Sequence, residues 1–148
     1  MAKINSRAKG ATAERELIGV LIEHLGDEIA SKMKRNLEQT RGGGHDIDGL
    51  DGWAIEVKRY KAVKEGDIAR FWEQTVDQAR RIDAKPVLCY REDFRSWRVR
   101  LPMSFVQGLE PTFDETVEWT VELGIEAFAA LVREEFNSKL ARGNIEQP

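Results

Sequence analysis

The sequence predicts a mixed α/β protein in which helices pack on one central sheet. Its 148 residues fit a single domain that is long enough to bury a core. Apolar residues recur with helical spacing in three segments, and short runs rich in branched and aromatic residues stand between them. The predicted order is helix, three strands, helix, two strands and helix, which is typical of a layered α/β fold.

The first helix is predicted over residues 11–25, and Gly26 follows it as a stop signal. One broad apolar stripe runs along this helix, formed by Leu17, Ile18, Leu21 and Leu25. Glu14 falls on that core-facing stripe and not on the solvent face. The ordinary explanation of such an acid is the first turn of a helix, where a carboxylate complements the helix dipole.

The remaining elements follow in chain order. Strands are expected at residues 31–40, 46–50, 52–60, 86–91 and 96–101. Asp51-Gly52 is a strong hairpin-turn signal between the second and third strands, and Glu92 to Arg95 join the last two. A second helix is predicted over 68–82 and a third over 125–140, whereas residues 103–122 are expected to be acidic and irregular.

Charge divides the chain into two parts. Residues 1–100 hold 20 Lys and Arg against 17 Asp and Glu, whereas residues 101–148 hold 3 against 9. We therefore expect a core at 1–102, with a basic arm at 1–10, and an acidic C-terminal extension at 103–148 that packs on it. A basic face that binds nucleic acid is one interpretation, and ordinary solvated charge is the other.

Composition excludes several classes of protein. The lone Cys89 cannot form an internal disulfide, and its apolar surroundings favour an inert core thiol. No apolar stretch approaches the ~20 residues that span a bilayer, so we expect no membrane partner. The N-terminus has no apolar core of a signal peptide, which favours a cytoplasmic protein.

The segment GHDIDGLDGWAIEVKRY concentrates charge inside an expected hairpin. Alternation along the strand places Glu56 and Lys58 on one face, opposite Trp53, Ile55 and Val57. The hairpin turn brings Asp46 beside Glu56. A solvated Glu and Lys on a half-exposed strand would explain the E-x-K pattern alone.

Converging carboxylates repel one another unless a cation lies between them, and oxygen ligands suit Mg²⁺ or Mn²⁺. A neighbouring lysine would orient an attacking water and offset the charge that develops on a phosphate. Asp48 competes with Asp46 for the ligand position, because both would point to the same face of a strand. His45 is either a contact to phosphate or an ordinary loop histidine.

The order Glu14, Asp46, Glu56-Val57-Lys58 resembles the PD-(D/E)xK nuclease superfamily. More narrowly, KGATAEREL at Lys9 to Leu17 and GHDIDGLDGWAIEVKR resemble motifs of archaeal-type and phage-type Holliday junction resolvases. His45 stands where the superfamily's proline would be. The resemblance covers residues 9–91 and implies a restriction-endonuclease-like αβββαβ core, with a central mixed sheet flanked by helices and a C-terminal helix added.

Carried over by position, the resemblance implies metal-site acids at Glu14, Asp46 and Glu56 and a catalytic lysine at Lys58. It implies a Mg²⁺-dependent DNA endonuclease, with Mn²⁺ as a substitute, that acts as a homodimer on four-way junctions. Cations that flank the site are expected to contact phosphates; they are Lys9, Arg15, Arg41, Arg59 and Lys61. The glycines at 42–44 either admit a phosphate or form a flexible turn.

Three alternatives stay open at this stage. The first is a nicking or restriction-like nuclease that acts on ordinary duplex DNA. The second is a non-catalytic DNA-binding or assembly protein on the same fold. The third, an interaction module whose acids bind Ca²⁺, is disfavoured because the spacing of an EF-hand is absent.

Overall fold

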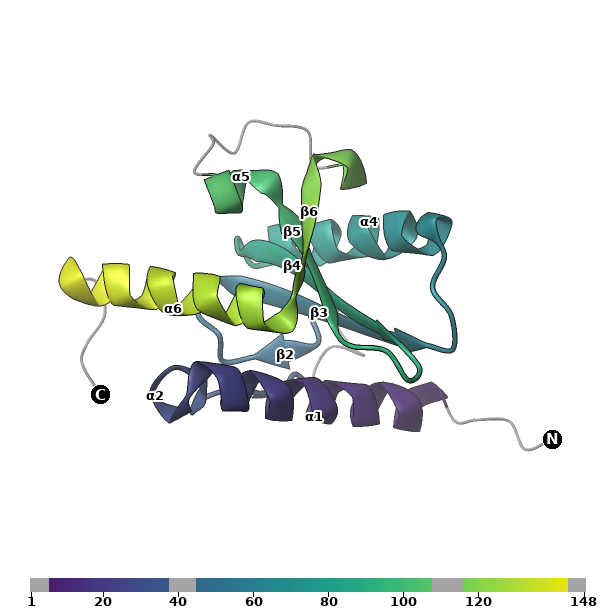
Figure 1. Cartoon of the computed structure of the whole chain (residues 1–148), viewed down its shortest axis with the longest axis horizontal. Helices are drawn as coiled ribbons and strands as arrows, with labels where there is room; N and C mark the ends of the chain where they lie inside the picture. Colours follow the sequence, from purple (N-terminus) through teal and green to yellow (C-terminus); the bar gives the residue numbers. More distant parts are fainter. Residues whose placement is uncertain (1–5, 38–44, 108–115, 144–148) are drawn as a thin grey trace.

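Six strands form one central sheet in the computed structural model, which describes residues 6–37, 45–107 and 116–143 (Figure 1). The strands lie in the order β1 to β6, and only β3 and β4 run parallel. They are β1 (Lys34–Arg35), β2 (Ile47–Asp48), β3 (Trp53–Tyr60), β4 (Lys85–Glu92), β5 (Arg98–Pro102) and β6 (Thr120–Gly124). The predicted mixed sheet is confirmed.

Helices cover both faces of this sheet. α1 (Ser6–Leu25) and α6 (Ile125–Ala141) contact each other and share one core with the inward side chains of β3, β4 and β5. α4 (Glu65–Arg81) lies on the opposite face, where Trp72 and Val76 pack against Leu88. Figure 1 shows α4 across the sheet from α1. α4 is also the crossover that two parallel neighbours require, so the predicted αβββαβ order is confirmed.

The short elements complete the chain. α2 (Asp27–Ala30) follows α1, α5 (Met103–Gln107) follows β5, and the 3-10 turn η1 (Val117–Trp119) precedes β6. Gly26, the predicted stop of the first helix, has a φ of 79°, which lets the chain reverse between α1 and α2. None of the described helices is long and apolar enough to cross a membrane.

The predicted and observed bounds differ at several elements: α1 begins at Ser6 and not at residue 11, and the strand predicted at 46–50 is only Ile47–Asp48. Two segments differ most. In the segment predicted as a strand at 31–40, only Lys34–Arg35 forms a strand among the described residues, and residues 38–40 lie outside the described part. The expectation of irregular structure at 103–122 is wrong for α5, η1 and β6. β6 forms because Val121 pairs with Leu101 and Leu123 with Val99, which gives its partly buried apolar residues a place against the core.

The C-terminal part contributes directly to the core. Phe128, Ala129 and Val132 of α6 are almost fully buried, and the Phe128 ring meets the Trp53 ring edge-on with centroids 5.4 Å apart. The division into a core at 1–102 and an extension at 103–148 stays a prediction, and the stability of a Phe128→Ala variant would test it. Cys89 is fully buried, and burial raises the pKa of its thiol, as expected of an inert core residue.

Candidate active site

The β2–β3 hairpin brings Asp46 to β3. Residues 50–53 form its turn, closed by the Trp53 amide donating to the Leu50 carbonyl at 3.1 Å, with Gly52 at a φ of 82°. Ile47 pairs with Ile55 in the antiparallel register, so Asp46 comes to lie opposite Glu56. Asp46 Oδ2 accepts a hydrogen bond of 2.7 Å from the Val57 amide, which fixes the carboxylate against β3.

Glu56 and Lys58 extend from the same side of β3. Lys58 Nζ lies 3.0 Å from Glu56 Oε1, and it also lies over the Phe71 ring of α4, 5.4 Å from its centroid. Glu56 is 3% exposed, and its second oxygen, Oε2, is buried without a hydrogen-bond partner unless the neighbouring Asp46 carboxyl is protonated and donates to it. A buried carboxylate oxygen without a donor is costly and indicates a place that a cation or water would satisfy.

Asp46 and Glu56 lie in surroundings that disfavour two negative charges side by side. Burial, followed by the negative charge of Glu56, raises the pKa of Asp46 to about 8. Burial also raises the pKa of Glu56, although the Lys58 ammonium opposes this change. The charge of Glu14 raises both pKa values further, so the three acids share one electrostatic environment. A divalent cation would reverse these shifts by stabilising the charged forms.

Glu14 is buried on α1 as predicted, but Arg35 of β1 binds it. The distance between Arg35 Nε and Glu14 Oε2 is 2.6 Å. Sequence reasoning missed Arg35, because nothing local connects the two residues, which are 21 positions apart. Within residues 6–37, 45–107 and 116–143, no group of three or more His, Cys, Asp or Glu is arranged to hold a metal ion. The structure therefore brings together Asp46, Glu56 and Lys58, with Glu14 near enough to raise the pKa of both acids and itself paired with Arg35.

The two competing aspartates have different partners. Asp46 accepts a hydrogen bond from the backbone of β3, whereas Asp48 Oδ1 is hydrogen-bonded to His45 Nε2. His45 and Asp48 line a cleft of about 840 Å³ between the β2–β3 turn and α6. The geometry favours Asp46 over Asp48 as the partner of Glu56, while the role of either residue as a ligand stays a prediction.

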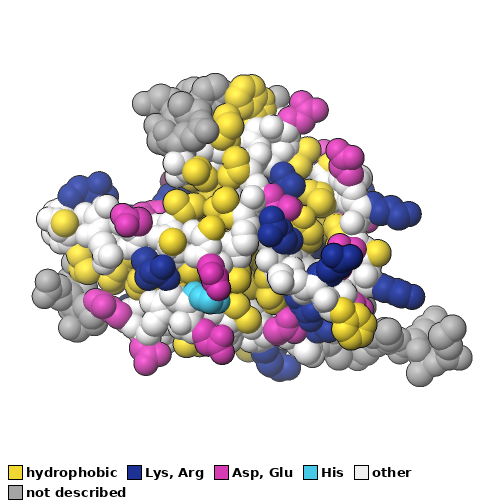
Figure 2. All heavy atoms as spheres, viewed as in Figure 1, with side chains coloured by type: hydrophobic (Ala, Val, Ile, Leu, Met, Phe, Trp, Pro, Cys, Tyr) yellow, Lys and Arg dark blue, Asp and Glu magenta, His cyan; other side chains and the backbone are white. Residues whose placement is uncertain are grey.

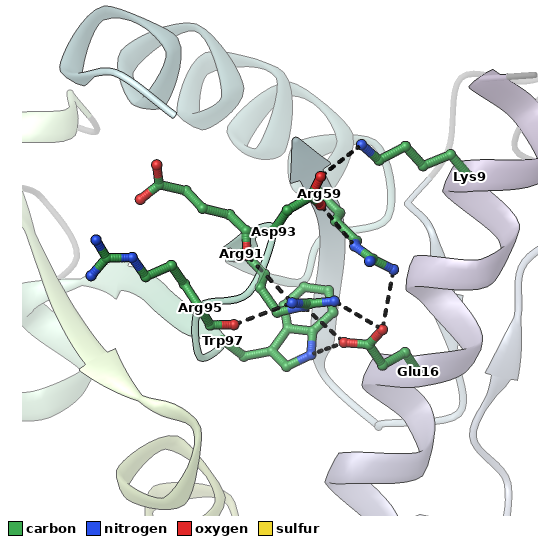
Figure 3. Close-up of polar contacts among 8 residues, drawn as sticks. Lys9, Glu16, Arg59, Arg91, Asp93, Arg95 and Trp97 are labelled. Carbon is green, nitrogen blue, oxygen red and sulfur yellow. Dashed lines mark hydrogen bonds and ion pairs between the residues drawn. The ribbon is translucent and has the colours of Figure 1, made fainter. Parts of the chain in front are cut away.

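The predicted phosphate contacts have different surroundings. Arg15 and Lys61 are exposed, Arg41 and the glycines at 42–44 lie outside the described residues, and Lys9 and Arg59 belong to an ion network. In that network Asp93 lies 3.7 Å from Lys9 Nζ and 3.3 Å from Arg59 Nε (Figure 3). These two cations are therefore held in place and partly neutralised.

Glu16 is the second acid of this network and was missed in the sequence. Its carboxylate accepts hydrogen bonds from Arg59 Nη1 at 3.3 Å, Arg91 Nη2 at 3.2 Å and Trp97 Nε1 at 3.0 Å. Figure 3 shows these donors converging on Glu16 from β3, from β4 and from Trp97, the residue just before β5. The parallel register pairs Arg59 with Arg91 and so brings both guanidinium groups to Glu16. The sequence alone does not reveal this contact, because it does not show which strands pair.

The family comparison agrees with the resemblance stated above. The model of the family described as "Phage putative PDDEXK endonuclease" matches residues 5–138, and the chain belongs to this family. Among solved structures, the Holliday junction resolvase Hjc of Archaeoglobus fulgidus is similar, with 23% sequence identity and a TM-score of 0.47, over 81% of this chain and 99% of that chain. No curated protein matches the chain significantly. The family match supports a nuclease.

Proposed function

We propose that this member of the phage PDDEXK endonuclease family hydrolyses DNA phosphodiester bonds with the help of Mg²⁺, and that branched DNA such as a four-way junction is its substrate. The observation that carries the proposal is the buried pair Asp46 and Glu56, with Lys58 bound to one of them. Two carboxylates and an ammonium at one strand edge suit hydrolysis of a phosphodiester.

The donor set fits a hard divalent cation. Oxygen ligands are present, and Glu56 Oε2 lacks a donor when both acids are ionised. A positive charge between the two acids would relieve the repulsion by Glu56 that helps to raise the pKa of Asp46. Asp46 and Glu56 would hold the ion, and Glu14 would join them once Arg35 releases it. A bound Mg²⁺ would supply charge stabilisation of the reacting phosphate.

Lys58 is the residue that we assign to the attacking water. One of its three N–H donors is used by Glu56, and the Phe71 ring supports the ammonium from the side. The other donors are available to orient water or to offset the charge that develops on a non-bridging phosphate oxygen. Val57 and Ile55 anchor the strand in the core on its other face, which limits the movement of Lys58.

We assign the neighbouring cations to the DNA backbone. Lys9, Arg15, Arg59, Lys61 and Arg41 would position phosphates without reading sequence. Figure 2 shows Lys and Arg side chains gathered around the β4–β5 hairpin, near the end of β3 that carries Lys58. A homodimer in the cytoplasm of a prokaryotic or phage-infected cell would present two such sites to opposite strands.

The test is cleavage of a labelled four-way junction and of a linear duplex with the same arm sequences, with and without Mg²⁺. Lys58→Ala should lower the cleavage rate by about 10²–10³-fold, the usual effect of removing one donor from a developing oxyanion. Glu56→Ala should abolish Mg²⁺-dependent cleavage. Lys139→Ala is the matched control, because Lys139 lies on α6, in an ion pair with Glu135.

The alternatives predict different results. Equal rates on the junction and the duplex would refute the junction substrate and favour a nicking or restriction-like nuclease. Absence of Mg²⁺-dependent cleavage, or cleavage that survives in Glu56→Ala, would favour a non-catalytic DNA-binding protein on this fold.

A further inference from the structure

Phe94 at the tip of the β4–β5 hairpin combines two unfavourable features. Its side chain is fully exposed, at 102% of the reference area, which leaves the whole ring in water. Its backbone has a φ of 64°, in the left-handed region that non-glycine residues rarely adopt. A glycine or asparagine would suit this turn position better on both counts. Strain and exposure at one residue indicate a contact that the free protein does not make.

The hairpin tip is held firmly although the Phe94 ring is exposed. Asp93 donates its amide to the Tyr60 carbonyl at 2.9 Å, and Arg95 closes the turn by donating to the Glu92 carbonyl at 3.1 Å. Arg91 Nη1 adds a hydrogen bond of 3.3 Å to the Arg95 carbonyl (Figure 3). A rigid base of this kind presents an aromatic side chain at a low entropic cost on binding.

The tip lies beside the candidate active site. β3 and β4 are parallel, with Lys58 opposite Tyr90 and Tyr60 opposite Glu92. The hairpin turn therefore starts next to Tyr60, which lies two residues or about 7 Å along β3 from Lys58. Successive phosphates of one DNA strand follow each other along the helix axis at about 3.4 Å, so a DNA strand held at Lys58 would extend to Phe94 within a few nucleotides.

The surroundings of Phe94 suit nucleic acid. At the tip and in the network below it, four cations stand against three carboxylates, which leaves a net charge of +1; the cations are Lys9, Arg59, Arg91 and Arg95, and the acids are Glu16, Glu92 and Asp93. Arg95 is exposed, and Figure 3 shows its guanidinium pointing away from Glu16. A bare aromatic ring framed by cations is the usual combination for stacking on a base while the backbone is held by charge.

We propose that Phe94 stacks on an unpaired or unstacked base close to the phosphate that is cut, so that the site prefers DNA whose base stack is interrupted. The inference rests on the proposed nuclease function and narrows its substrate class. In an intact duplex both faces of every base are covered by neighbours, so the Phe94 ring gains a partner only where stacking is broken, as at a branch point.

The experiment compares Phe94→Ala, Phe94→Gly and Phe94→Trp in the full chain. Binding to a four-way junction and to a linear duplex with the same arms is measured by fluorescence anisotropy without divalent metal, and cleavage is measured with Mg²⁺. Ile82→Ala is the matched control, because Ile82 is also an exposed apolar residue, at 47%, but follows the C-terminal end of α4. Thermal unfolding of each variant reports whether the turn is intact.

Phe94→Ala and Phe94→Gly should weaken junction binding by about 5-fold to 100-fold, the range for loss of one base–aromatic stack. Duplex binding should stay within about twofold, Phe94→Trp should retain the preference for the junction, and Phe94→Gly should unfold at the same temperature as wild type or a higher one. A 2-aminopurine base placed at the branch point should change fluorescence with wild type and not with Phe94→Ala.

Equal losses on the junction and the duplex, or no loss on either, would overturn the proposal. A change of sedimentation in Phe94→Ala would also overturn it, since Phe94 would then contact a second copy of the chain. The binding measurement without metal separates failure of the Phe94 proposal from failure of the proposed function. Junction-selective binding that depends on Phe94, without any cleavage, would refute the nuclease function but not the Phe94 contact.

Discussion

Replacing Asp46 with asparagine should stabilise the metal-free protein at alkaline pH and not at acidic pH. The pKa of Asp46 is raised from 3.8 to about 8 by burial and by the Glu56 charge, so the folded state binds a proton that the unfolded state releases above pH 4. Stability therefore falls as pH rises through this window. The side chain introduced by Asp46→Asn would stay neutral, and its amide oxygen would still accept the hydrogen bond from the Val57 amide.

The magnitude follows from the width of the window. Between the two pKa values, each unit of pH lowers the free energy of unfolding by about 1.36 kcal/mol. From pH 5 to pH 8 the wild-type protein should therefore lose about 4 kcal/mol of stability. If Asp46 and Glu56 share the proton, about half of this belongs to Asp46. A chain of this length gains roughly 2–4 °C per kcal/mol, so Asp46→Asn should unfold about 4–8 °C above wild type at pH 8.

Thermal unfolding at pH 5 and pH 8, in the presence of a chelator, measures the difference in unfolding temperature, and urea unfolding under the same conditions measures the difference in free energy. Asp48→Asn is the matched control, because Asp48 is two residues away and paired with His45. Mg²⁺ should reverse the result, since it stabilises wild type more at pH 8 than at pH 5 and leaves Asp46→Asn unchanged. Parallel losses of stability in wild type and Asp46→Asn between the two pH values would refute the electrostatic reasoning.

Two further predictions concern the scaffold. Gly49→Ala should lower the free energy of unfolding by about 3 kcal/mol or more, because φ is 95° and the new Cβ would lie 1.9 Å from the Lys32 carbonyl oxygen. The control is Gly10→Ala on α1, where a new Cβ meets nothing within 4 Å. This control should be neutral or stabilising in the same urea titration. Phe128→Ala should cost about 3–5 kcal/mol, and a loss below about 1 kcal/mol would show that residues 1–102 fold without α6.

The hairpin was predictable because its signals are local. Asp51-Gly52 specifies the turn, and the alternation of Trp53, Ile55 and Val57 specifies which face of β3 is buried. Together they fix the register that places Asp46 opposite Glu56. Helical spacing likewise placed Glu14 on the buried face of α1, since a residue's face depends only on its neighbours in the chain.

Contacts between distant segments were not predictable in the same way. Arg35 binds Glu14 only because β1 pairs at the edge of the sheet next to α1, and the single sequence carries no sign of that pairing. β6 was missed because its segment is acidic: Glu122 points toward Arg98 and Arg100 of β5, and these cross-strand ion pairs make an acidic strand acceptable. The same acids looked like solvated loop residues in the sequence.

Two groups of residues that break local rules meet at β3. β3 carries the buried Glu56 and the Lys58 that partly neutralises it, while its last residue, Tyr60, anchors the turn that strains Phe94. The regular geometry of a strand allows this, because its buried apolar face stabilises the sheet while the opposite face and the far end accept unfavourable groups. The core contacts of Ile55 and Val57 therefore do more than stabilise the fold, since they hold the charged pair and the hairpin tip at a fixed spacing. If that spacing matters, Val57→Ala, which creates a cavity beneath the site, should lower the activity on junctions more than its loss of stability alone explains.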